Sequence, residues 1–559
     1  MKIKNIFVSL VFLILFTNCS DQMDYGEYAN YDKDDVASSF SRVNNFVTNI
    51  YGKLDSGFYP YGDAMLASAC DEAEYAWSHS SIHDFYNGAW SSTNAKSDVW
   101  SNSYWAIRAV NRYLRDFSNL TFDDFKYNQD YKEQIERYNR YKYEVRFLRA
   151  YFYFNLVRQY GDVPFTEDVL TETEANSLSR TPKAQIFDYI VSECDAIANE
   201  LPVSYQNVTY KETGRITRIT VLALKARTLL YKASPLFTNG TDNTEYWKEA
   251  AIANKAVIDA CAEAGIKLGK YTDLWGANNW KASEVIFARK LGKSRTLESL
   301  NFPIGVEGGN SGNCPTQTLV DAYEMKTTGK LWNEAGSGYD VTKPYANRDP
   351  RLGYTIACNG DQWPYTVLET YIGGANALPI SGGTPTGYYL KKYMDLTVSL
   401  NPNNLLDKPH AWITYRLGEF YLNYAEAMFR YLKSADATDA SNNLNMSACD
   451  AVNVIRKRSD VNVLALPTGL SNEAFEKKYM NERMVELAFE GHRFWDVRRW
   501  KKGEVLKQIE VMTISKNADD SFTYIRSSKK RNWSEKMYWF PISNTEMMIN
   551  PNLVQNPGW

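Results

Sequence analysis

The sequence lacks several features that mark enzymes, nucleic-acid-binding proteins and multi-pass membrane proteins. No cysteines have the Cys-x-x-Cys spacing of a zinc ribbon, and no long basic block offers an electrostatic footprint for nucleic acid. No Gly-x-Ser-x-Gly elbow, HExxH pattern or glycine-rich phosphate loop occurs. After residue 16, no segment has about 18 uninterrupted apolar residues. These absences favour a binding protein that is not an enzyme, with no metal site, no cofactor and no nucleic-acid partner.

The first residues have the pattern of an export signal. Two early lysines precede an apolar run over 6–16, which is shorter than the roughly 20 residues that span a bilayer. Cys19, just after this run, resembles the acylation site of a bacterial lipoprotein. We therefore expect a signal peptide over 1–18, lipidation of Cys19, and a linker from the lipid anchor over 19–35. The alternative is a plain secretory peptide that is cut nearby, with Cys19 incidental.

Aromatic residues are unusually common in the rest of the chain, with 40 Tyr, 25 Phe and 15 Trp. Tyr and Trp combine a flat apolar face with a polar group, which suits both sugar rings and the packing of helices. Composition does not separate these two roles. Of the six cysteines after Cys19, Cys194 and Cys261 lie on apolar stripes, so buried thiols are predicted there. A disulfide between Cys314 and Cys358 stays an open alternative.

Helical periodicity dominates most of the chain, because apolar residues recur at steps of three and four. The stripes are Tyr141, Val145, Leu148, Phe152 and Leu156; Ile186, Ile190, Cys194 and Ile197; Trp247, Ala250, Asn254, Val257 and Cys261; and Ile413, Leu417, Phe420, Tyr424 and Met428. The first helix is expected to stop at Gly161, and a further helix is expected over 221–233. Paired helices with small residues on their faces are typical of tetratricopeptide-like solenoids. We predict a mainly α fold, with a tetratricopeptide-like helical-repeat scaffold.

Residues 265–410 differ from this pattern, because they are rich in Gly, Asn, Pro and Thr and lose the helical period. We predict an irregular, loop-rich excursion there, with a few short strands such as 285–288. A rigid scaffold that carries irregular loops is a common arrangement for binding. The domain is therefore expected to cover 36–559, with the ligand-binding excursion inside it.

Five blocks of the sequence, in the same order, resemble those of the SusD/RagB family. They read RFLRAYFYF and YGDVP (146–164), LALKAR (222–227), YRLGEFYLNYAEA (415–427), ERMVELAFEGHRFWDVRRW (482–500), and YWFPI with NPNLVQNPGW (538–559). The resemblance thus covers nearly the whole chain that follows the export signal.

The resemblance implies a cell-surface lipoprotein of the outer membrane with a tetratricopeptide-like scaffold. Proteins of this family bind oligosaccharides, or in some members peptides, and sit as a lid on a SusC-like TonB-dependent transporter. The resemblance therefore implies capture of an oligosaccharide and its delivery to that partner, without catalysis. Two alternatives stay open: a peptide-binding, RagB-like uptake protein, and a surface glycan hydrolase.

The block over 482–500 places Glu, His, Asp and Arg together, which would also suit a catalytic site. Buried charges need partners, and the charges of this block can pair with one another. We therefore predict that the block belongs to the scaffold.

The segment over 68–94 is the best candidate for ligand contacts, because carboxylates, imidazoles and indoles gather there without a clean helical stripe. Carboxylates accept hydrogen bonds from sugar hydroxyls, and an indole stacks on the apolar face of a sugar ring. The predicted glycan-binding residues of this segment are Asp71, Glu74, Trp77, His83, Trp90 and Asn94. Packing of the two Trp side chains in the first helices is the alternative. His79 and His83 would suit a metal if they shared a helix, although surface histidines are the simpler interpretation.

A second aromatic group lies at the start of the excursion and within it. In the family, the aromatic platform takes residues from this middle portion as well. The resemblance therefore adds Tyr271, Trp275, Trp280 and Trp332 to the predicted glycan-binding residues. Packing is at least as good an interpretation for each of them.

Overall fold

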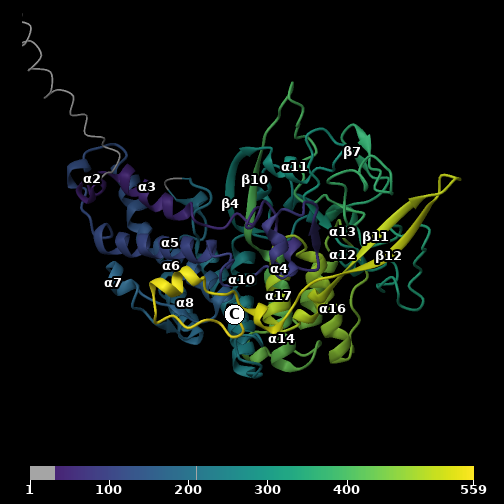
Figure 1. Cartoon of the computed structure of the whole chain (residues 1–559). Coiled ribbons are helices and arrows are strands. Elements are labelled where there is room, and N and C mark those ends of the chain that lie inside the picture. The colour runs from purple at the N-terminus through teal and green to yellow at the C-terminus, as the bar shows by residue number, and fades with distance from the viewer. Residues whose placement is uncertain (1–31, 209–210) are drawn as a thin grey trace, which may run out of the picture.

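The computed structural model describes residues 32–208 and 211–559. The predicted signal peptide, the predicted lipidation site Cys19 and most of the linker therefore lie outside the described residues. The described chain is mainly helical with short strands, which confirms the predicted fold class (Figure 1). Among these residues, no helix combines the length and the apolarity needed to cross a bilayer.

The scaffold is a set of helices, most of which pack against the next one along the chain. Its helices are α3 (Phe40–Tyr51), α5 (Asp98–Asp116), α6 (Tyr131–Tyr160), α8 (Lys183–Ile197), α9 (Arg218–Ala233), α10 (Thr244–Glu263), α14 (Leu417–Leu432), α15 (Ala448–Arg456), α16 (Asn472–Glu486) and α17 (His492–Arg499). Contacts run from α5 to α6, α8, α9, α10, α14 and α15 in turn. The helix pairs that the sequence predicts therefore form one continuous stack.

The helix ends follow from local chemistry. The helix α6 ends at Tyr160, where Gly161 adopts φ +74°, a conformation that favours glycine. The side chain of Thr217 accepts a hydrogen bond from the backbone of Thr220 and begins α9. Asn243 begins α10 in the same way. These ends agree with the predicted boundaries to within a few residues.

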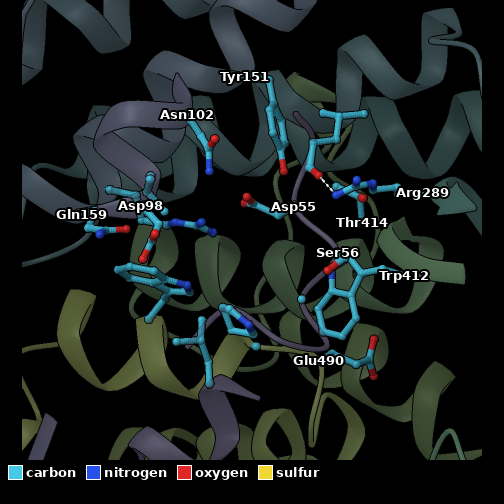
Figure 2. Close-up of a pocket in the computed structure, with 18 of the residues that line it drawn as sticks. Asp55, Ser56, Asp98, Asn102, Tyr151, Gln159, Arg289, Trp412, Thr414 and Glu490 are labelled. Atoms are coloured by element: carbon cyan, nitrogen blue, oxygen red, sulfur yellow. Dashed lines mark hydrogen bonds between the residues drawn. The ribbon is translucent and has the colours of Figure 1, made fainter. Parts of the chain in front are cut away.

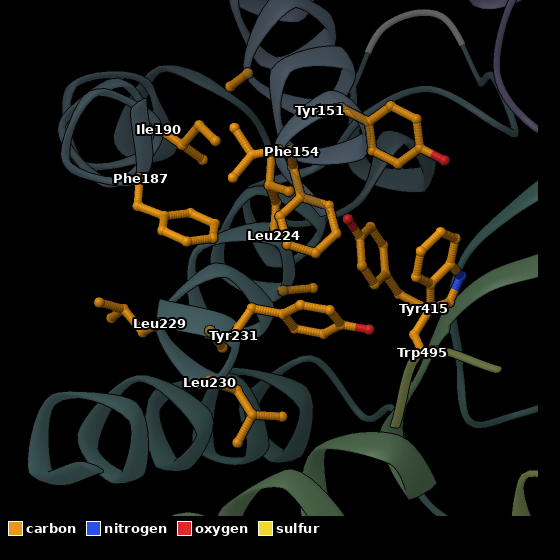
Figure 3. Packing of buried hydrophobic residues seen from close by; sticks show 14 of the residues in the cluster. Tyr151, Phe154, Phe187, Ile190, Leu224, Leu229, Leu230, Tyr231, Tyr415 and Trp495 are labelled. Carbon is orange, nitrogen blue, oxygen red and sulfur yellow. The ribbon is translucent and has the colours of Figure 1, made fainter. Parts of the chain in front are cut away.

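The buried faces of the scaffold form a core that is rich in aromatic rings. Figure 3 shows Phe154 of α6 beside Phe187 and Ile190 of α8 and Leu224 of α9. The rings of Phe154 and Tyr231 meet edge to face, with their centroids 5.2 Å apart. Much of the aromatic content of the sequence therefore stabilises the scaffold.

The chain between α10 and α14 leaves the scaffold and returns to it, since these two helices pack directly against each other. The excursion forms a second core together with residues of the 58–73 segment, the 484–489 segment and β11 (Gln508–Lys516). Its elements are β4 (Val285–Ser294), α11 (Thr296–Asn301), β5 (Asn313–Pro315), α12 (Gln317–Ala322), α13 (Arg351–Thr355), β6 (Ile356–Ala357), β7 (Gln362–Trp363), β8 (Thr366–Val367), β9 (Tyr389–Leu390) and β10 (Lys408–Arg416). Its longest sheet pairs β4 with β10 in antiparallel register.

The remaining elements are short or lie near the ends of the described chain. They are α2 (Lys33–Ala37), β1 (Ala73–Tyr75), α4 (Asp84–Asn87), β2 (Val163–Pro164), α7 (Glu172–Ala175), β3 (Arg180–Thr181), β11 (Gln508–Lys516), β12 (Phe522–Lys530) and α18 (Asn544–Ile549). The hairpin of β11 and β12 extends away from the rest of the molecule (Figure 1). The strand β1 pairs with β5 and so joins the early segment to the excursion.

One predicted helix begins later than the sequence suggested. Ile413 belongs to β10, where it pairs with Ala288, and α14 begins only at Leu417. The run from Trp412 to Tyr415 is aromatic and β-branched, which favours a strand. The helical spacing of Ile413 with Leu417 was therefore a coincidence of two adjacent elements.

The block over 482–500 forms a buried network of ion pairs. Glu486 accepts hydrogen bonds from Arg351, Arg416 and Arg458, with N···O distances of 2.9, 2.8 and 3.0 Å. In a second group of buried ion pairs, Arg499 pairs with Glu426 at 2.6 Å and with Asp496 at 2.8 Å. The charges of the block are therefore paired in structural contacts, some within the block and others with the excursion.

The six described cysteines are all buried and free. Cys194 and Cys261 are buried thiols, which confirms that prediction. Cys314 and Cys358 do not form the disulfide that the sequence left open.

Candidate functional site

A cavity of about 440 Å³ lies where the scaffold meets the excursion (Figure 2). The loop over 52–61, after α3, forms one side of it. The helices α5, α6 and α9, the strands β4 and β10, and the start of α17 supply the rest. Ligand sites in proteins usually fall in the range of about 300–1,000 Å³, so this cavity has the size of a binding site.

Aromatic rings form part of the cavity lining. They belong to Tyr59, Tyr61, Tyr151, Tyr231, Trp412 and Trp495. The indole of Trp412 lies against the backbone of Gly57, where an added Cβ atom would come within 2.1 Å of the ring. Only glycine therefore allows this loop to pack so closely on Trp412. Such rings offer flat apolar faces on which a ligand can stack.

Polar groups lie between these rings. Asn102, Gln159, Ser56 and Thr414 add amide and hydroxyl groups to the lining (Figure 2). A lining of aromatic faces with a few hydrogen-bonding groups suits a ligand that has both apolar and hydroxylated faces, as a sugar does.

Three charged groups of the cavity form a connected set. The amide of Asn155 donates to Asp55 at 3.2 Å and accepts from Arg158 at 2.9 Å. Arg289, from β4, donates to the backbone carbonyl of Leu54 and, at 3.0 Å, to that of Gly52. Arg289 thus ties the 52–61 loop to the excursion and brings a positive charge to the same cavity as Asp55.

Burial perturbs the protonation of two groups in the cavity. Burial raises the pKa of the Asp55 carboxyl, while the nearby Arg158 and Arg289 oppose that rise. Burial, together with nearby arginines, holds the pKa of the His492 imidazole well below its usual range. His492 is therefore neutral at physiological pH and adds no charge to the site.

Four of the ten residues predicted to bind glycan are buried in structural contacts. Asp71 pairs with Arg493, and Glu74 pairs with Arg531 and Lys529. Trp90 packs among Phe85, Phe540 and Trp559, and the hydroxyl of Tyr271 accepts a hydrogen bond from Lys392 at 3.0 Å. These contacts favour structural roles for the four.

The other six predicted residues are half-buried. They are Trp77, His83, Asn94, Trp275, Trp280 and Trp332. The indole N–H of Trp77 donates to the carbonyl of Asn310 at 2.7 Å, and the guanidinium of Arg526 lies 3.6 Å from the ring centre of Trp332. All ten predicted residues lie in the described chain, and none of them lines the cavity.

The two histidines considered for a metal do not share a helix. His79 is exposed in a turn, whereas His83 ends a short 3-10 turn (Ser81–His83) and contacts the hydroxyl of Tyr86 at 2.7 Å. Within the described ranges, no group of three His, Cys, Asp or Glu side chains is placed to hold a metal ion.

Sequence reasoning missed the residues that line the cavity, and the reason is physical. Asp55, Arg158, Arg289 and Trp412 come from four elements that are far apart in the chain. The sequence around each of them carries no sign of a binding site, because they are a carboxylate in a loop, an arginine near a helix end and two strand residues. Only the return of the excursion onto the scaffold brings them together.

Comparison with known proteins gives two matching family models. The model described as the SusD family matches residues 283–559. The model described as "Starch-binding associating with outer membrane" matches residues 24–230. The two matches together include most of the scaffold and most of the excursion, and the helix α10 lies between them.

Individual proteins are similar along nearly the whole chain. SusD-like protein P25 of Formosa agariphila is 23% identical over 100% of this chain and 98% of its own. SusD-like protein P2 of the same organism is 22% identical over 83% of this chain and 80% of its own. Among solved structures, a SusD-like carbohydrate-binding protein of Bacteroides fragilis is 25% identical, with a TM-score of 0.74 over 93% of this chain and 100% of that one.

Proposed function

The chain belongs to the SusD/RagB family, and from that premise we propose that it captures oligosaccharides at the cell surface and delivers them to a SusC-like TonB-dependent transporter. The B. fragilis protein is named a SusD-like carbohydrate-binding protein, which supports glycan binding by this chain. The proposed mechanism is binding and transfer without cleavage, so the protein acts as a receptor and not as a hydrolase.

One observation carries this proposal: the cavity between scaffold and excursion combines aromatic walls with hydrogen-bonding groups. The rings of Tyr59 and of the largely buried Trp412 contribute to the lining, and Asn102, Gln159 and Thr414 contribute amide and hydroxyl groups. By analogy with aromatic pairs, each ring face that stacks on a sugar contributes about 1 kcal/mol beyond the buried area. A single site of this kind binds modestly, and many copies on one surface raise the avidity.

The location is part of the proposal. One matching family model carries the words "associating with outer membrane" in its description. We propose that lipidation at Cys19 provides that association, with the protein held at the outer face of the outer membrane. Labelling of intact cells with a fatty-acid analogue tests this, since Cys19→Ser should abolish both the label and membrane retention.

Isothermal titration of the purified chain against a panel of oligosaccharides tests the binding function. We expect at least one class of glycan to bind, and we expect Trp412→Ala to weaken that binding by about tenfold. Tyr365→Ala is the matched control, because Tyr365 is fully exposed and lies outside the cavity lining. Its affinity should equal that of the wild type.

Two other results would replace the proposal. Binding to peptides with no binding to any glycan would identify a RagB-like peptide receptor. New reducing ends after incubation with the best-bound glycan would identify a hydrolase. Loss of affinity in Tyr365→Ala but not in Trp412→Ala would move the site away from the cavity.

A further inference from the structure

We propose that the cavity selects acidic glycans, with Arg158 as the anchor for a carboxylate or sulfate group on a sugar ring. This inference rests on the proposed function and specifies the class of ligand. It begins from two guanidinium groups, those of Arg158 and Arg289, which line the cavity. Neither forms an ion pair with a carboxylate of the described chain, although both lie near Asp55.

Arg158 has hydrogen-bonding capacity that the described residues do not use. A guanidinium carries five N–H donors. Arg158 donates through Nη2 to Asn155, and its buried Nε has no acceptor among residues 32–208 and 211–559. A buried donor without an acceptor is unfavourable, so an acceptor group of a ligand that reached the guanidinium would relieve that cost.

Other buried arginines of the protein show what Arg158 lacks. Arg227, which also lines the cavity, pairs with Glu419 through two nitrogen atoms. Arg351 and Arg416 also pair with carboxylates. Arg158 instead lies over the ring of Trp495, with its guanidinium carbon 4.3 Å from the ring centre, near the C-terminus of α6. Those contacts hold the cation in place but leave its donors available.

The charges that line the cavity leave a net positive balance. Glu490 is paired with Lys392 and Arg416, and Arg227 is paired with Glu419. The charges of Glu490 and Arg227 are therefore neutralised by these partners. His492 is neutral. The remaining charged side chains of the lining are Lys53, Arg158 and Arg289 against Asp55 and Asp98.

The position of Asp98 strengthens this balance. Asp98 is exposed at the start of α5, so solvent screens its charge, whereas Asp55 is more deeply placed. The inner part of the cavity therefore holds two arginines and one carboxylate. One anionic group of a ligand would neutralise the excess charge, and a guanidinium matches carboxylate or sulfate oxygens with two parallel N–H···O bonds.

The aromatic walls point to a sugar as the carrier of this anion. A free inorganic anion would need no aromatic lining, whereas Trp412 and Tyr59 line the same cavity as the arginines. A uronic acid and a sulfated sugar share the required chemistry: a pyranose ring with an anionic oxygen group.

The test is titration of the purified chain with matched pairs of oligosaccharides. Oligogalacturonate is compared with its methyl ester, and a sulfated galactan oligosaccharide with its desulfated form. We expect one acidic member to bind at least about tenfold more tightly than its neutral partner, with a preference that weakens as salt is raised. The two arms show whether carboxylate or sulfate is preferred.

Single-residue variants show which side chains cause the preference for acidic glycans. Arg158→Gln should lower affinity for the acidic glycan by a larger factor than for the neutral one, so that the acidic preference is lost, whereas Arg158→Lys should keep part of the preference. Asp55→Asn should strengthen acidic binding, because it removes a like charge. Arg218→Gln, an exposed arginine at the start of α9, is the control and should behave as the wild type.

The outcomes separate this inference from the proposed function. Equal binding of acidic and neutral partners, or an acidic preference that survives Arg158→Gln, overturns the inference and leaves glycan capture intact. No binding to any glycan overturns both. Thermal melting checks that Arg158→Gln is folded. If it is not, the inference is tested by the affinities of Arg158→Lys and by the wild-type comparison of oligogalacturonate with its methyl ester.

Discussion

The guanidinium of Arg493 donates two hydrogen bonds to the carboxylate of Asp71, at 2.9 and 2.7 Å, although 422 positions separate the two residues. Asp71 lies in the segment predicted to bind ligand, and Arg493 lies in α17. The pair therefore joins the early segment of the chain to the C-terminal end of the scaffold. Asp71 is only 1% exposed, so its carboxylate is occupied by the contact with Arg493 and is not open to a ligand.

Asp71→Ala is expected to lower the free energy of unfolding by about 3 kcal/mol, because it leaves the Arg493 cation buried without its partner. Urea denaturation measures this change. Asp124→Ala, at an exposed carboxylate, should have almost no effect. If Asp71→Ala kept full stability but lost glycan affinity, Asp71 would be a ligand contact after all.

Glu72, next to this pair, should make stability depend on pH. Burial and the neighbouring Asp71 raise the pKa of the Glu72 carboxyl to about 8. The folded state therefore holds a proton on Glu72 that the unfolded state has released above about pH 4.5. The stability from this proton is fully present below that pH and is lost as the pH rises through about 8.

Glu72→Gln keeps the neutral form at every pH, so its free energy of unfolding should fall less than that of the wild type between about pH 5 and 8. Urea denaturation across that range measures the difference. Other titrating groups are common to both proteins and cancel. The exposed Glu307→Gln is the control, and an identical pH profile for Glu72→Gln and wild type would contradict the prediction.

Gly57→Ala should damage the cavity more than an equally strained glycine substitution elsewhere. Gly57 and Gly338 both have positive φ, at +61° and +80°, but only at Gly57 would the new Cβ meet Trp412. We expect Gly57→Ala to weaken glycan binding by about tenfold through displacement of that ring. Gly338→Ala should lose some stability and keep its affinity, and equal affinities in the two variants would argue against a role for Trp412.

Trp77, predicted from the sequence as a ligand contact, is half-buried and lies outside the cavity lining. We propose that it extends the site toward longer ligands. Trp77→Ala should weaken binding of long oligosaccharides by about threefold and leave disaccharide binding unchanged. Titration with a length series measures this, and an equal loss for every length would place Trp77 in the main site instead.

The scaffold was predictable because helical periodicity is local. The stripes through Leu148, Ile190 and Val257 each lie within one helix, and the cap at Gly161 ends the first of them. The strand that contains Ile413 was not predictable, because its pairing with Ala288 depends on a segment more than a hundred residues away. Local spacing does not reveal such a partner.

The cavity was not predictable for the same reason. Arg158 closes a helix and Arg289 sits in a strand, and nothing in the flanking residues of either shows that they line the same cavity. Trp90 shows the opposite case. An indole in a polar segment resembles a ligand contact, whereas the indole of Trp90 packs on Phe540. Burial decides between these roles, and a single sequence does not encode burial directly.

The most direct test of the account is a crystal structure of the chain with its tightest-binding oligosaccharide. We expect a sugar ring in the cavity, stacked on Trp412 and hydrogen-bonded to Arg158. A ligand ordered on another face, with Trp412 and Arg158 untouched, would contradict it.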